Sequence, residues 1–453
     1  MTDCTTQTLL FASLDRRQIV ADFRGGDLTS DAGLLLLREV DRKIGLLDAL
    51  NDVIFDPRNQ RLVVHDQRTM LAQRVLGIAA AYEDLNDHNT LRRDTLLQTA
   101  TGRRLKLSQE EGDPLASPST LCRLENRITR GELVGMAKIL VEVFVNSHLT
   151  PPEELVLDFD ATNDPVHGRQ EGRFFHGYYD EYCFLPLYVF CGDQLLVSYL
   201  RPANIDAARH SRAILCLLVR RFRQAWPNVR IIFRADSGFC RWRVLRWCDR
   251  HGVDYIVGLA KNDVLERRAR RSMVQAHWDY RCRGEKQRLF EEFPYAAGTW
   301  DRPRRVIAKA EHGEQGQNPR FVVTSLQGPG QELYEKLYCQ RGEMENRIKE
   351  QQLHLFADRT SCHDFLANQL RVLLSAAAYV LMETLRRVGL AGTELAQAQV
   401  DTIRLKLLKI GARVVRSVRR IVLHLASGYP LAELLAGVLR RLQDWRCLPA
   451  ATP

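Results

Sequence analysis

The sequence predicts an α/β protein in which a central mixed sheet is flanked by helices. Residues 155–260 alternate between strand-like and helix-like patterns in the order β-β-β-α-β-α-β, which favours one sheet covered by helices. Most of the residues before 151, and those from 332 to 390, have the apolar spacing of amphipathic helices. The chain has 453 residues, of which 45% are hydrophobic and 26% charged, so it is long enough for a large core and about two to four domains.

Changes in texture along the chain predict four parts. Pro151 and Pro152 end a helical pattern, and the strand–helix alternation breaks off after residue 260, where the strand-like strings RRVIAKAEH and RFVVTSL follow. We therefore predict a helical N-terminal region, 1–150; a core formed by 151–260 and 331–360; a β-rich insertion, 261–330; and a basic C-terminal region, 361–453.

Within the N-terminal part, we expect a helix over 31–43 that begins at Ser30 or Asp31, and a longer one that begins at Asp66. Residues 102–118 are polar and read as a connector. Ser117 caps a further helix, TLCRLENRI, which is either a DNA recognition helix or a helix that packs in a bundle. An apolar helix ends near His148.

Within the core, we expect a first strand at 155–160, two or three strands within 173–200, a helix over 206–225, a strand at 229–236, a short helix that ends at Gly252, and a strand at 253–260. Long helices follow over 332–356 and 363–390. Apolar and basic residues alternate over 402–425, which predicts a pair of strands with a basic face, and a last helix spans 431–442.

The excess positive charge of the chain, +10, is unevenly distributed. Residues 1–150 carry a net charge of −2, residues 151–360 of +5 and residues 361–453 of +7. A run of basic residues after Asp401 is followed by no acidic residue before Glu433. This run is either a solvated face or a surface for DNA phosphates, and we favour the second: Arg404, Lys406, Lys409, Arg413, Arg416, Arg419 and Arg420.

Several classes of protein are disfavoured by the sequence. The 11 cysteines form no CxxC pair, which argues against a disulfide framework or a zinc ribbon and favours a reducing cytoplasm. No window approaches 18 consecutive apolar residues, and the N-terminus lacks a basic segment before its apolar stretch. We therefore expect neither a membrane span nor a signal peptide.

Two aspartates follow neighbouring strands of the predicted sheet. Asp160 ends the first strand, and Asp236 ends the strand after the first long helix. Carboxylates at the ends of adjacent strands meet at one edge of a sheet, and their mutual repulsion is relieved by a hard cation such as Mg²⁺ or Mn²⁺. Asp158 is an alternative to Asp160, because alternation along the strand places both on one face.

A helix beyond the insertion supplies a third carboxylate. In YCQRGEMENRIKEQQ, Tyr338, Arg341 and Glu345 lie on one helical stripe, which Lys349 and Gln352 extend. Three such acids are able to hold two metal ions for phosphodiester chemistry, while the neighbouring cations hold phosphates. A single acid in such a position is more often a cap or an exposed residue. The prediction of a metal site therefore depends on all three acids occurring together in this order.

These residues resemble those of one known family. The spacing of Tyr338, Arg341 and Glu345 is similar to the Y-x2-R-x3-E signature of bacterial insertion-sequence transposases with an Asp-Asp-Glu triad. The strings LDFDATNDPVHGRQEG, RADSGFCRWRVLRWC and YCQRGEMENRIKE resemble insertion-sequence family thirteen-eighty, within the insertion-sequence-four-like group. Gln352 stands where the signature continues to a Lys, and Lys349, one turn earlier, is an alternative for that role.

The resemblance implies an RNase H-like core with a β-strand insertion, and a transposase that cuts transposon ends and transfers the freed 3′-OH into target DNA. Asp160, Asp236 and Glu345 would be the catalytic residues and the ligands of two Mg²⁺ ions, for which Mn²⁺ may substitute. Tyr338, Arg341 and Lys349 would contact DNA, the helical region 1–150 would bind DNA, and the basic region 361–453 would serve DNA binding or dimerisation. The implied partners are double-stranded DNA, as terminal inverted repeats and target, and a second copy of the chain. The implied place is the bacterial cytoplasm, at the nucleoid.

Trp300, in the insertion, is a candidate for stacking on a flipped base, although a core tryptophan is the more common role. Two rival functions stay open: a metal-dependent nuclease of the same fold without strand transfer, and a DNA-binding protein that has lost catalysis. The intact triad of acids argues against the second.

Overall fold

The computed structural model describes residues 8–103 and 114–448, so most of the predicted connector lies outside the described residues. The chain divides into two compact units. Unit 1 consists of Met1–Arg127 and Ala377–Arg446, and unit 2 of Ile128–Ala376 and Cys447–Pro453. Unit 1 therefore combines the N-terminal segment with a segment from the last fifth of the sequence, whereas unit 2 contains the predicted core and insertion.

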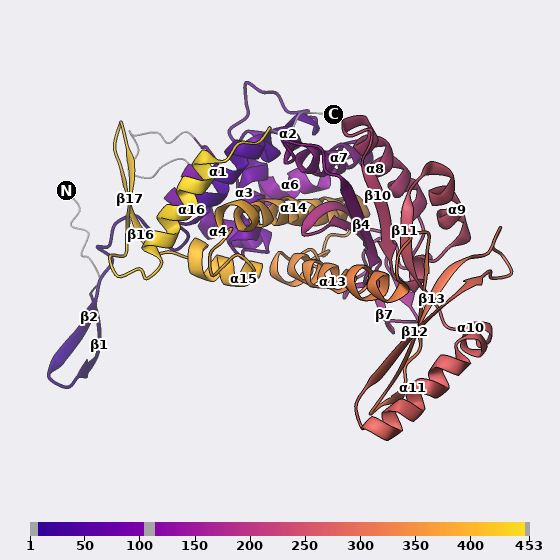
Figure 1. The fold of residues 1–453 in the computed structure, drawn as a ribbon. Helices are drawn as coiled ribbons and strands as arrows, with labels where there is room; N and C mark the ends of the chain where they lie inside the picture. Colours follow the sequence, from indigo (N-terminus) through magenta and orange to yellow (C-terminus); the bar gives the residue numbers. More distant parts are fainter. Residues whose placement is uncertain (1–7, 104–113, 449–453) are drawn as a thin grey trace, which may run out of the picture. The chain divides into compact units, whose positions relative to one another are not determined.

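Unit 2 is built around a nine-stranded mixed sheet (Figure 1). In spatial order its strands are β12 (Gln287–Tyr295), β13 (Arg304–Gly313), β15 (Arg320–Thr324), β11 (Asp254–Leu259), β10 (Arg230–Ala235), β4 (Glu154–Ala161), β8 (Leu187–Cys191) and β9 (Gln194–Tyr199), with β14 (Gly316–Gln317) paired to β13.

The strand directions define the core. β4, β10 and β11 are parallel to one another, and β8 and β9 continue the sheet beyond β4 as antiparallel neighbours. In chain order, the first three strands of this sheet are β4, β8 and β9, which pair as antiparallel neighbours. β10 and β11 follow through helical connections and lie on the other side of β4. This order is that of an RNase H-like core. The predicted α/β fold class, a mixed sheet flanked by helices, is therefore confirmed.

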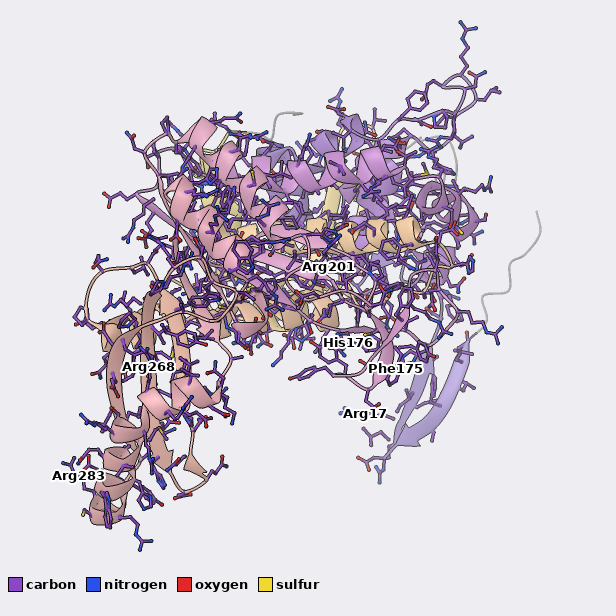
Figure 2. All side chains as sticks on the ribbon, turned by 90° about the vertical axis from the view of Figure 1, so that its right-hand side faces the viewer. Arg17, Phe175, His176, Arg201, Arg268 and Arg283 are labelled. Atoms are coloured by element: carbon purple, nitrogen blue, oxygen red, sulfur yellow. The ribbon has the colours of Figure 1, made fainter. Side chains whose placement is uncertain are left out.

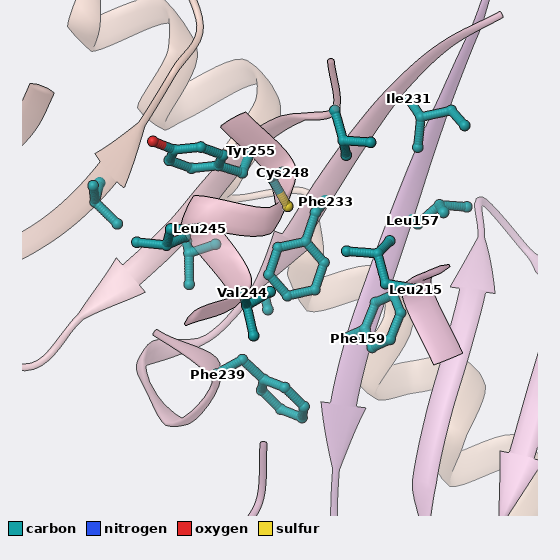
Figure 3. Close-up of a cluster of buried hydrophobic side chains, with 14 of the residues drawn as sticks. Leu157, Phe159, Leu215, Ile231, Phe233, Phe239, Val244, Leu245, Cys248 and Tyr255 are labelled. Carbon is teal, nitrogen blue, oxygen red and sulfur yellow. The ribbon is translucent and has the colours of Figure 1, made fainter. Parts of the chain in front are cut away.

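Helices cover one face of this core. α8 (Ser211–Ala225) and α9 (Trp242–His251) connect the parallel strands and pack their apolar sides on the sheet, as Figure 3 shows. Leu157 and Phe159 of β4 point to this side and meet Phe233 of β10, whose ring lies 5.0 Å from that of Phe159. α7 (Arg130–Asn146) adds Phe144 to the same cluster.

The opposite face of the sheet carries the chain that follows the insertion. Ile232 and Ile256 pack there against Tyr334. The segment is helical with two π-helical stretches: α12 (Gly330–Glu332), η3 (Leu333–Tyr338), α13 (Arg341–Lys349) and η4 (Glu350–His354). Because side chains alternate along β4, Asp158 and Asp160 face this segment and not α8 and α9.

The insertion continues the sheet through β12, β13 and β15, and the predicted strands RRVIAKAEH and RFVVTSL are present as β13 and β15. Two helices, α10 (Asp263–Arg268) and α11 (Arg270–Arg283), precede them and were not expected. Figure 2 labels Arg268 and Arg283 at the ends of these helices. α11 buries only Met273 and Ala276, so its sequence carries almost no apolar stripe to reveal it.

A small separate sheet lies beside the end of β4. It consists of β5 (Asp164–Pro165), β7 (Glu181–Phe184) and β6 (Phe174–His176), in that spatial order. Figure 2 labels Phe175 and His176 on its outer strand. η2 (Ser237–Phe239) follows β10 directly.

Unit 1 is mainly helical. Its N-terminal helices are α1 (Leu34–Ile44), α2 (Leu46–Asp52), α3 (Gln67–Ala79), α4 (His88–Leu91), α5 (Thr95–Ala100) and α6 (Pro118–Asn126), with a 3-10 turn η1 (Leu85–Asp87). Asp66 caps α3, as predicted, by accepting from the Thr69 amide at 2.8 Å. α6, the predicted TLCRLENRI helix, places Glu125 in a buried ion pair with Arg74 of α3 at 2.9 Å, so α6 packs in a bundle.

The C-terminal part of unit 1 begins in α14 (Phe365–Thr384) and contains η5 (Leu385–Gly389), α15 (Val400–Ile403), η6 (Arg404–Leu408), β16 (Ala412–Arg416), β17 (Ile421–Leu425) and α16 (Ala432–Asp444). The predicted strand pair exists only from residue 412 onward; residues 400–408 are helical instead. Gly33, before α1, touches this segment: a Cβ there would lie 1.7 Å from the Leu407 carbonyl oxygen. This close contact requires glycine.

Unit 1 also contains three strands near the N-terminus: β1 (Leu9–Leu14), β2 (Arg17–Ala21) and β3 (Leu28–Thr29). β1 and β2 pair only with each other, whereas β3 joins β16 and β17. The N-terminal region is therefore less completely helical than predicted.

One helical stretch, Phe365–Gly389, is long and apolar enough to cross a membrane by length and composition alone. In the structure, 83% of its most apolar window is buried. Burial of this kind is typical of the core helix of a soluble protein, so the helix is weak evidence for a membrane span.

We predict that Phe233→Ala destabilises unit 2 by about 3–5 kcal/mol, because the removed ring leaves a cavity in the cluster under α8 and α9. Urea unfolding followed by tryptophan fluorescence measures this, since tryptophans 226, 242, 247, 278 and 300 all belong to unit 2. Leu217→Ala, at a side chain of α8 that is 62% exposed, is the control and should change the unfolding free energy by no more than about 0.5 kcal/mol. Equal effects of the two substitutions would contradict the packing.

Candidate active site

Asp160 and Asp236 lie side by side because of the strand register. β4 and β10 are parallel, and their last registered pair is Phe159 with Ala235, so the next residue on each strand is one of the two aspartates. Oδ1 of Asp236 accepts a hydrogen bond from the Gly238 amide at 2.9 Å, which fixes the turn after β10. The two predicted strand-end acids therefore meet at one edge of the sheet.

Asp158, the alternative first ligand, is already committed to another partner. Its carboxylate accepts from Nε and Nη2 of Arg234 at 2.5 and 2.7 Å, and both side chains are buried. Nη1 of Arg234 also donates to the Leu337 carbonyl at 2.5 Å. This bidentate pair neutralises Asp158 and ties β10 to η3, which leaves Asp160 as the acid at the open edge.

Arg341 links the third acid to the first. At the start of α13, its Nη1 donates to Oδ2 of Asp160 at 3.1 Å and its Nη2 to Oε1 of Glu345 at 2.7 Å. Arg341 and Glu345 are one helical turn apart, so the predicted stripe is present in α13. The side chain of Glu345 is 47% exposed, whereas that of Asp160 is 14% exposed.

The electrostatics of Asp160 reflect this crowding of acids. The pKa of Asp160 is raised from 3.8 to about 7, and burial is the largest cause of the increase. The negative charges of Asp236 and Glu345 raise that pKa further, and the Arg341 guanidinium lowers it. A raised pKa produced by burial and by neighbouring carboxylates is typical of a functional site.

Tyr338 completes the same edge. It ends η3, and its phenol packs against Gly258 of β11, which is next to Asp236 in register. A Cβ on Gly258 would lie 2.6 Å from Oη of Tyr338 and 2.7 Å from the Ser237 amide nitrogen. Burial raises the pKa of the Tyr338 hydroxyl, and the Asp236 charge adds to this.

Gly258 was not singled out from the sequence. The available signal was a glycine inside the strand pattern VDYIVGLA, because such a glycine often marks a close approach of another chain segment. Tyr179 was also missed. It packs beside Ala161 at the end of β4, and burial, together with the charge of Asp160, raises the pKa of its hydroxyl to about 12.

Gln352 and Lys349 have different surroundings in the structure. The amide of Gln352 donates to the Asn163 carbonyl at 3.0 Å, so it fixes the chain just after β4. Lys349 is exposed on α13. Gln352 therefore has a structural contact at the position where the signature places Lys.

Asp160 and Asp236 at the sheet edge, with Glu345 joined to Asp160 through Arg341, offer the hard oxygen donors that Mg²⁺ and Mn²⁺ prefer. The raised pKa of Asp160 is the observation that tests the fit: burial disfavours the charged carboxylate and Arg341 offsets this only in part, so a cation at this edge would stabilise the charged form. Among the residues that the structure describes, no three His, Cys, Asp or Glu side chains are close enough to hold an ion as they stand. Arg341, bonded to both Asp160 and Glu345, is the cation between those two acids.

The predicted DNA-contacting residues outside this edge have varied surroundings. Trp300 is half-buried: its ring lies 5.6 Å from Tyr295, and the Arg304 guanidinium lies 5.5 Å above it. These contacts, together with its place beside the main core cluster, match the role of a packing residue.

In the basic run, Arg404 is buried, and its Nε donates to the Ala79 carbonyl at 2.7 Å. Lys409 pairs with Asp31 at 2.7 Å and Arg416 with Asp27 at 3.1 Å, so acids from the N-terminal segment face the run. The remaining members of the run are exposed: Lys406, Arg413, Arg419 and Arg420.

A family model described as "Transposase DDE domain group 1" matches residues 11–447. None of the curated proteins matches the chain. Among solved structures, the chain is similar to the piggyBac transposase in a synaptic complex with hairpin DNA, at 9% identity and a TM-score of 0.42, over 84% of this chain and 80% of that one. That likeness is distant, so the evidence for the function of this chain is the family match and the geometry of the site.

We predict that Asp160→Asn stabilises the metal-free protein at high pH. The pKa of this carboxyl is raised in the folded state, so the folded state loses stability as pH rises from about 4 to about 7 and regains none above it. The asparagine cannot ionise, so the gain should be near zero at pH 4 and about 4 kcal/mol at pH 8.

Urea unfolding in EDTA at pH 4, 6 and 8 measures this difference. Glu314→Gln, at an exposed acid of the insertion, is the control and should show no pH-dependent gain. A gain in unfolding free energy for Asp160→Asn that is equal at all three pH values would contradict a raised pKa of this carboxyl in the folded protein.

Proposed function

We propose how this chain acts on DNA, starting from the fact that it belongs to the family of transposases with a DDE domain of group 1. The proposal is that Asp160, Asp236 and Glu345 are its catalytic residues, and that they hold two Mg²⁺ ions, for which Mn²⁺ can substitute. The observation that supports it best is the meeting of Asp160 and Asp236 at one edge of the sheet, with Glu345 joined to Asp160 through Arg341.

Magnesium at this edge would activate the attacking oxygen and stabilise the leaving oxygen of a phosphodiester. The residues of the chain have separate roles. Arg341 holds the acids together before the metal arrives and, once released from them, is placed to hold a DNA phosphate. Tyr338, packed on Gly258 beside Asp236, offers a hydroxyl to the same phosphate. Asp158 and Arg234 keep the edge rigid through their buried ion pair.

We propose two successive reactions at this site. A water molecule first attacks the phosphodiester at the transposon end and releases a 3′-OH. That 3′-OH then attacks a phosphodiester of target DNA, so one bond forms as another breaks and the number of phosphodiesters is conserved in the second step. The DNA partners are the terminal inverted repeats and the target duplex, and two copies of the chain would bring two ends together in the bacterial cytoplasm, at the nucleoid.

The exposed arginines of the β16–β17 hairpin are proposed to bind the DNA backbone. Arg413, Arg419 and Arg420 have exposed side chains, and no ion pair of theirs is found in the described part of the chain. Lys406 and Lys349 are exposed as well, on their own helical segments. We leave Arg404 and Trp300 out of this proposal, because both are held in the fold by contacts of their own.

We predict that Glu345→Ala and Asp236→Ala each reduce DNA cutting by more than about a hundredfold, since even the outer partners of metal ligands are worth about 10–100-fold. The assay incubates the purified full chain with Mg²⁺ and labelled DNA that carries the flanks of its own gene. Joined products in addition to cut ends would support strand transfer, whereas cut ends without joining would identify a nuclease.

Glu343→Ala is the matched control, because Glu343 is an exposed glutamate of the same helix, two residues from Glu345. It should retain cutting close to that of the unchanged protein. Cutting that survives in Asp236→Ala, or that is lost equally in Glu343→Ala, would overturn the catalytic assignment.

We also predict that neutralising Arg413, Arg419 and Arg420 weakens DNA binding at moderate salt and makes the salt dependence less steep. Each lost phosphate contact should lower the slope of log K against log salt by about 0.9. A variant that neutralises Arg61, Arg93 and Arg440, three exposed arginines of unit 1 outside the hairpin, is charge-matched. Identical slopes for the two triple variants would identify the hairpin as ordinary solvated surface.

A further inference from the structure

A cavity of about 480 Å³ lies where α8 and α9 begin, and the acids of the candidate active site do not line it. Its lining is strongly basic. The charged and titratable residues around it are Asp206, Arg209, His210, Arg212, Arg241 and Arg243. Four guanidinium groups thus face a single carboxylate in one hollow of unit 2.

The cations in this cavity are only partly neutralised. Arg241 pairs with Asp206 at 2.5 Å, which uses the one acid. Arg243 lies 5.4 Å from the ring centroid of Trp242, and no carboxylate of a described residue pairs with it. Among the residues that the structure describes, Arg209 and Arg212 form no ion pair, and both are exposed.

Two helix N-termini open into the same cavity. α8 has 15 residues and α9 has 10, and neither His210 nor Arg241, their N-cap residues, makes a capping hydrogen bond with its side chain. The Ser211 amide donates to the Ala208 carbonyl at 3.1 Å, and the Val244 amide donates to the Arg241 carbonyl at 2.9 Å. The amides of Arg212 and Ala213 in α8, and of Trp242 and Arg243 in α9, have no backbone acceptor among the described residues, and the two helix dipoles add positive potential at this place.

A buried arginine supports the loop that forms the wall of the cavity. Arg201, labelled in Figure 2, is fully buried and has no carboxylate partner. Its Nη1 donates to the carbonyls of Ala207 and Arg209 at 3.0 and 2.6 Å, while its Nη2 has no hydrogen-bond partner. Burial lowers the pKa of His210, and the charges of Arg201 and Arg209 lower it further, as expected where the local potential is positive.

The topology places this cavity at the catalytic edge of the sheet. β9 runs parallel to β4, so α8, which follows β9, starts at the edge where Asp160 stands. α9 starts just after β10, and Arg241 is five residues beyond Asp236. The basic cavity and the acids therefore share one edge, with the cavity on the face covered by α8 and α9.

We propose that this cavity binds a phosphate of the DNA backbone on the strand next to the phosphodiester that the acids cut. The inference rests on the proposed function for the identity of the ligand. A phosphate fits because it presents several acceptor oxygens to two sets of open amides and to arginines that lack partners. Nucleic acid is favoured over a free anion because the cavity lies at the same sheet edge as the acids.

The test compares duplex binding by the full chain in EDTA, where no cutting occurs, over a range of salt. The double variant Arg209→Ala/Arg212→Ala should bind several-fold more weakly, with a slope of log K against log salt that is about 2 smaller. Arg220→Ala, at an exposed arginine of α8 outside the cavity, is the control and should bind like the unchanged protein.

Ethylation interference provides the second measurement. Ethylation of one or two backbone phosphates near the cut should block binding by the unchanged protein and lose its effect on the double variant. Equal slopes and an unchanged ethylation pattern in a folded double variant would overturn the inference. The protein could also bind duplex DNA through the cavity and yet fail to cut it with Mg²⁺. That result would contradict the catalytic proposal and leave the inference about the cavity in place.

Discussion

The repulsion between carboxylates at the ends of β4 and β10 is the constraint on which the rest of the site depends. The parallel register places Asp160 and Asp236 next to each other, and no adjustment of rotamers removes them from the same edge. Arg341 offsets part of this charge by bonding to Asp160 and Glu345 together. Burial nevertheless keeps the pKa of Asp160 near 7, so the charged carboxylate stays disfavoured in spite of Arg341. A divalent cation would favour the charged form, and its binding would compete with Arg341 for the same oxygens.

Much of this arrangement could be predicted from sequence because it follows from local periodicity. The order of strands and helices over 155–260 is visible in the alternation of apolar residues, and it alone places Asp160 and Asp236 on neighbouring strand ends. Helical spacing likewise places Arg341 and Glu345 on one stripe. The choice of Asp160 over Asp158 was not local. It depends on Arg234, whose pairing with Asp158 becomes evident only once β4 and β10 are aligned.

What the sequence could not provide are contacts between distant segments and helices without an apolar stripe. Lys409 and Arg416 seemed to lack acidic partners because Asp31 and Asp27 are almost 400 residues away in the chain. Arg404 looked like part of a basic face, yet its guanidinium satisfies a buried carbonyl of α3. α11 escaped notice because basic residues dominate it and only two of its side chains are buried. In each case a tertiary contact, and not the local pattern, decided the structure.

The catalytic edge carries an electrostatic conflict that unit 2 itself has the means to resolve. DNA is a polyanion, and three carboxylates at close range oppose its approach by an amount comparable to the gain from single phosphate contacts, about 1 kcal/mol for each pair of charges at 4 Å in water. Cations offset this only within about a Debye length, roughly 8 Å at physiological salt. Cations far along the chain, such as those of the β16–β17 hairpin, would raise only the general affinity for DNA, because offsetting the local repulsion needs positive charge close to the carboxylates. The arginines at the start of α8 and α9 stand at the same sheet edge, and three of them, Arg209, Arg212 and Arg243, form no ion pair with a described residue. The separation of acids on one face of the sheet from arginines on the other allows metal and DNA to be attracted to the same edge without neutralising each other's sites.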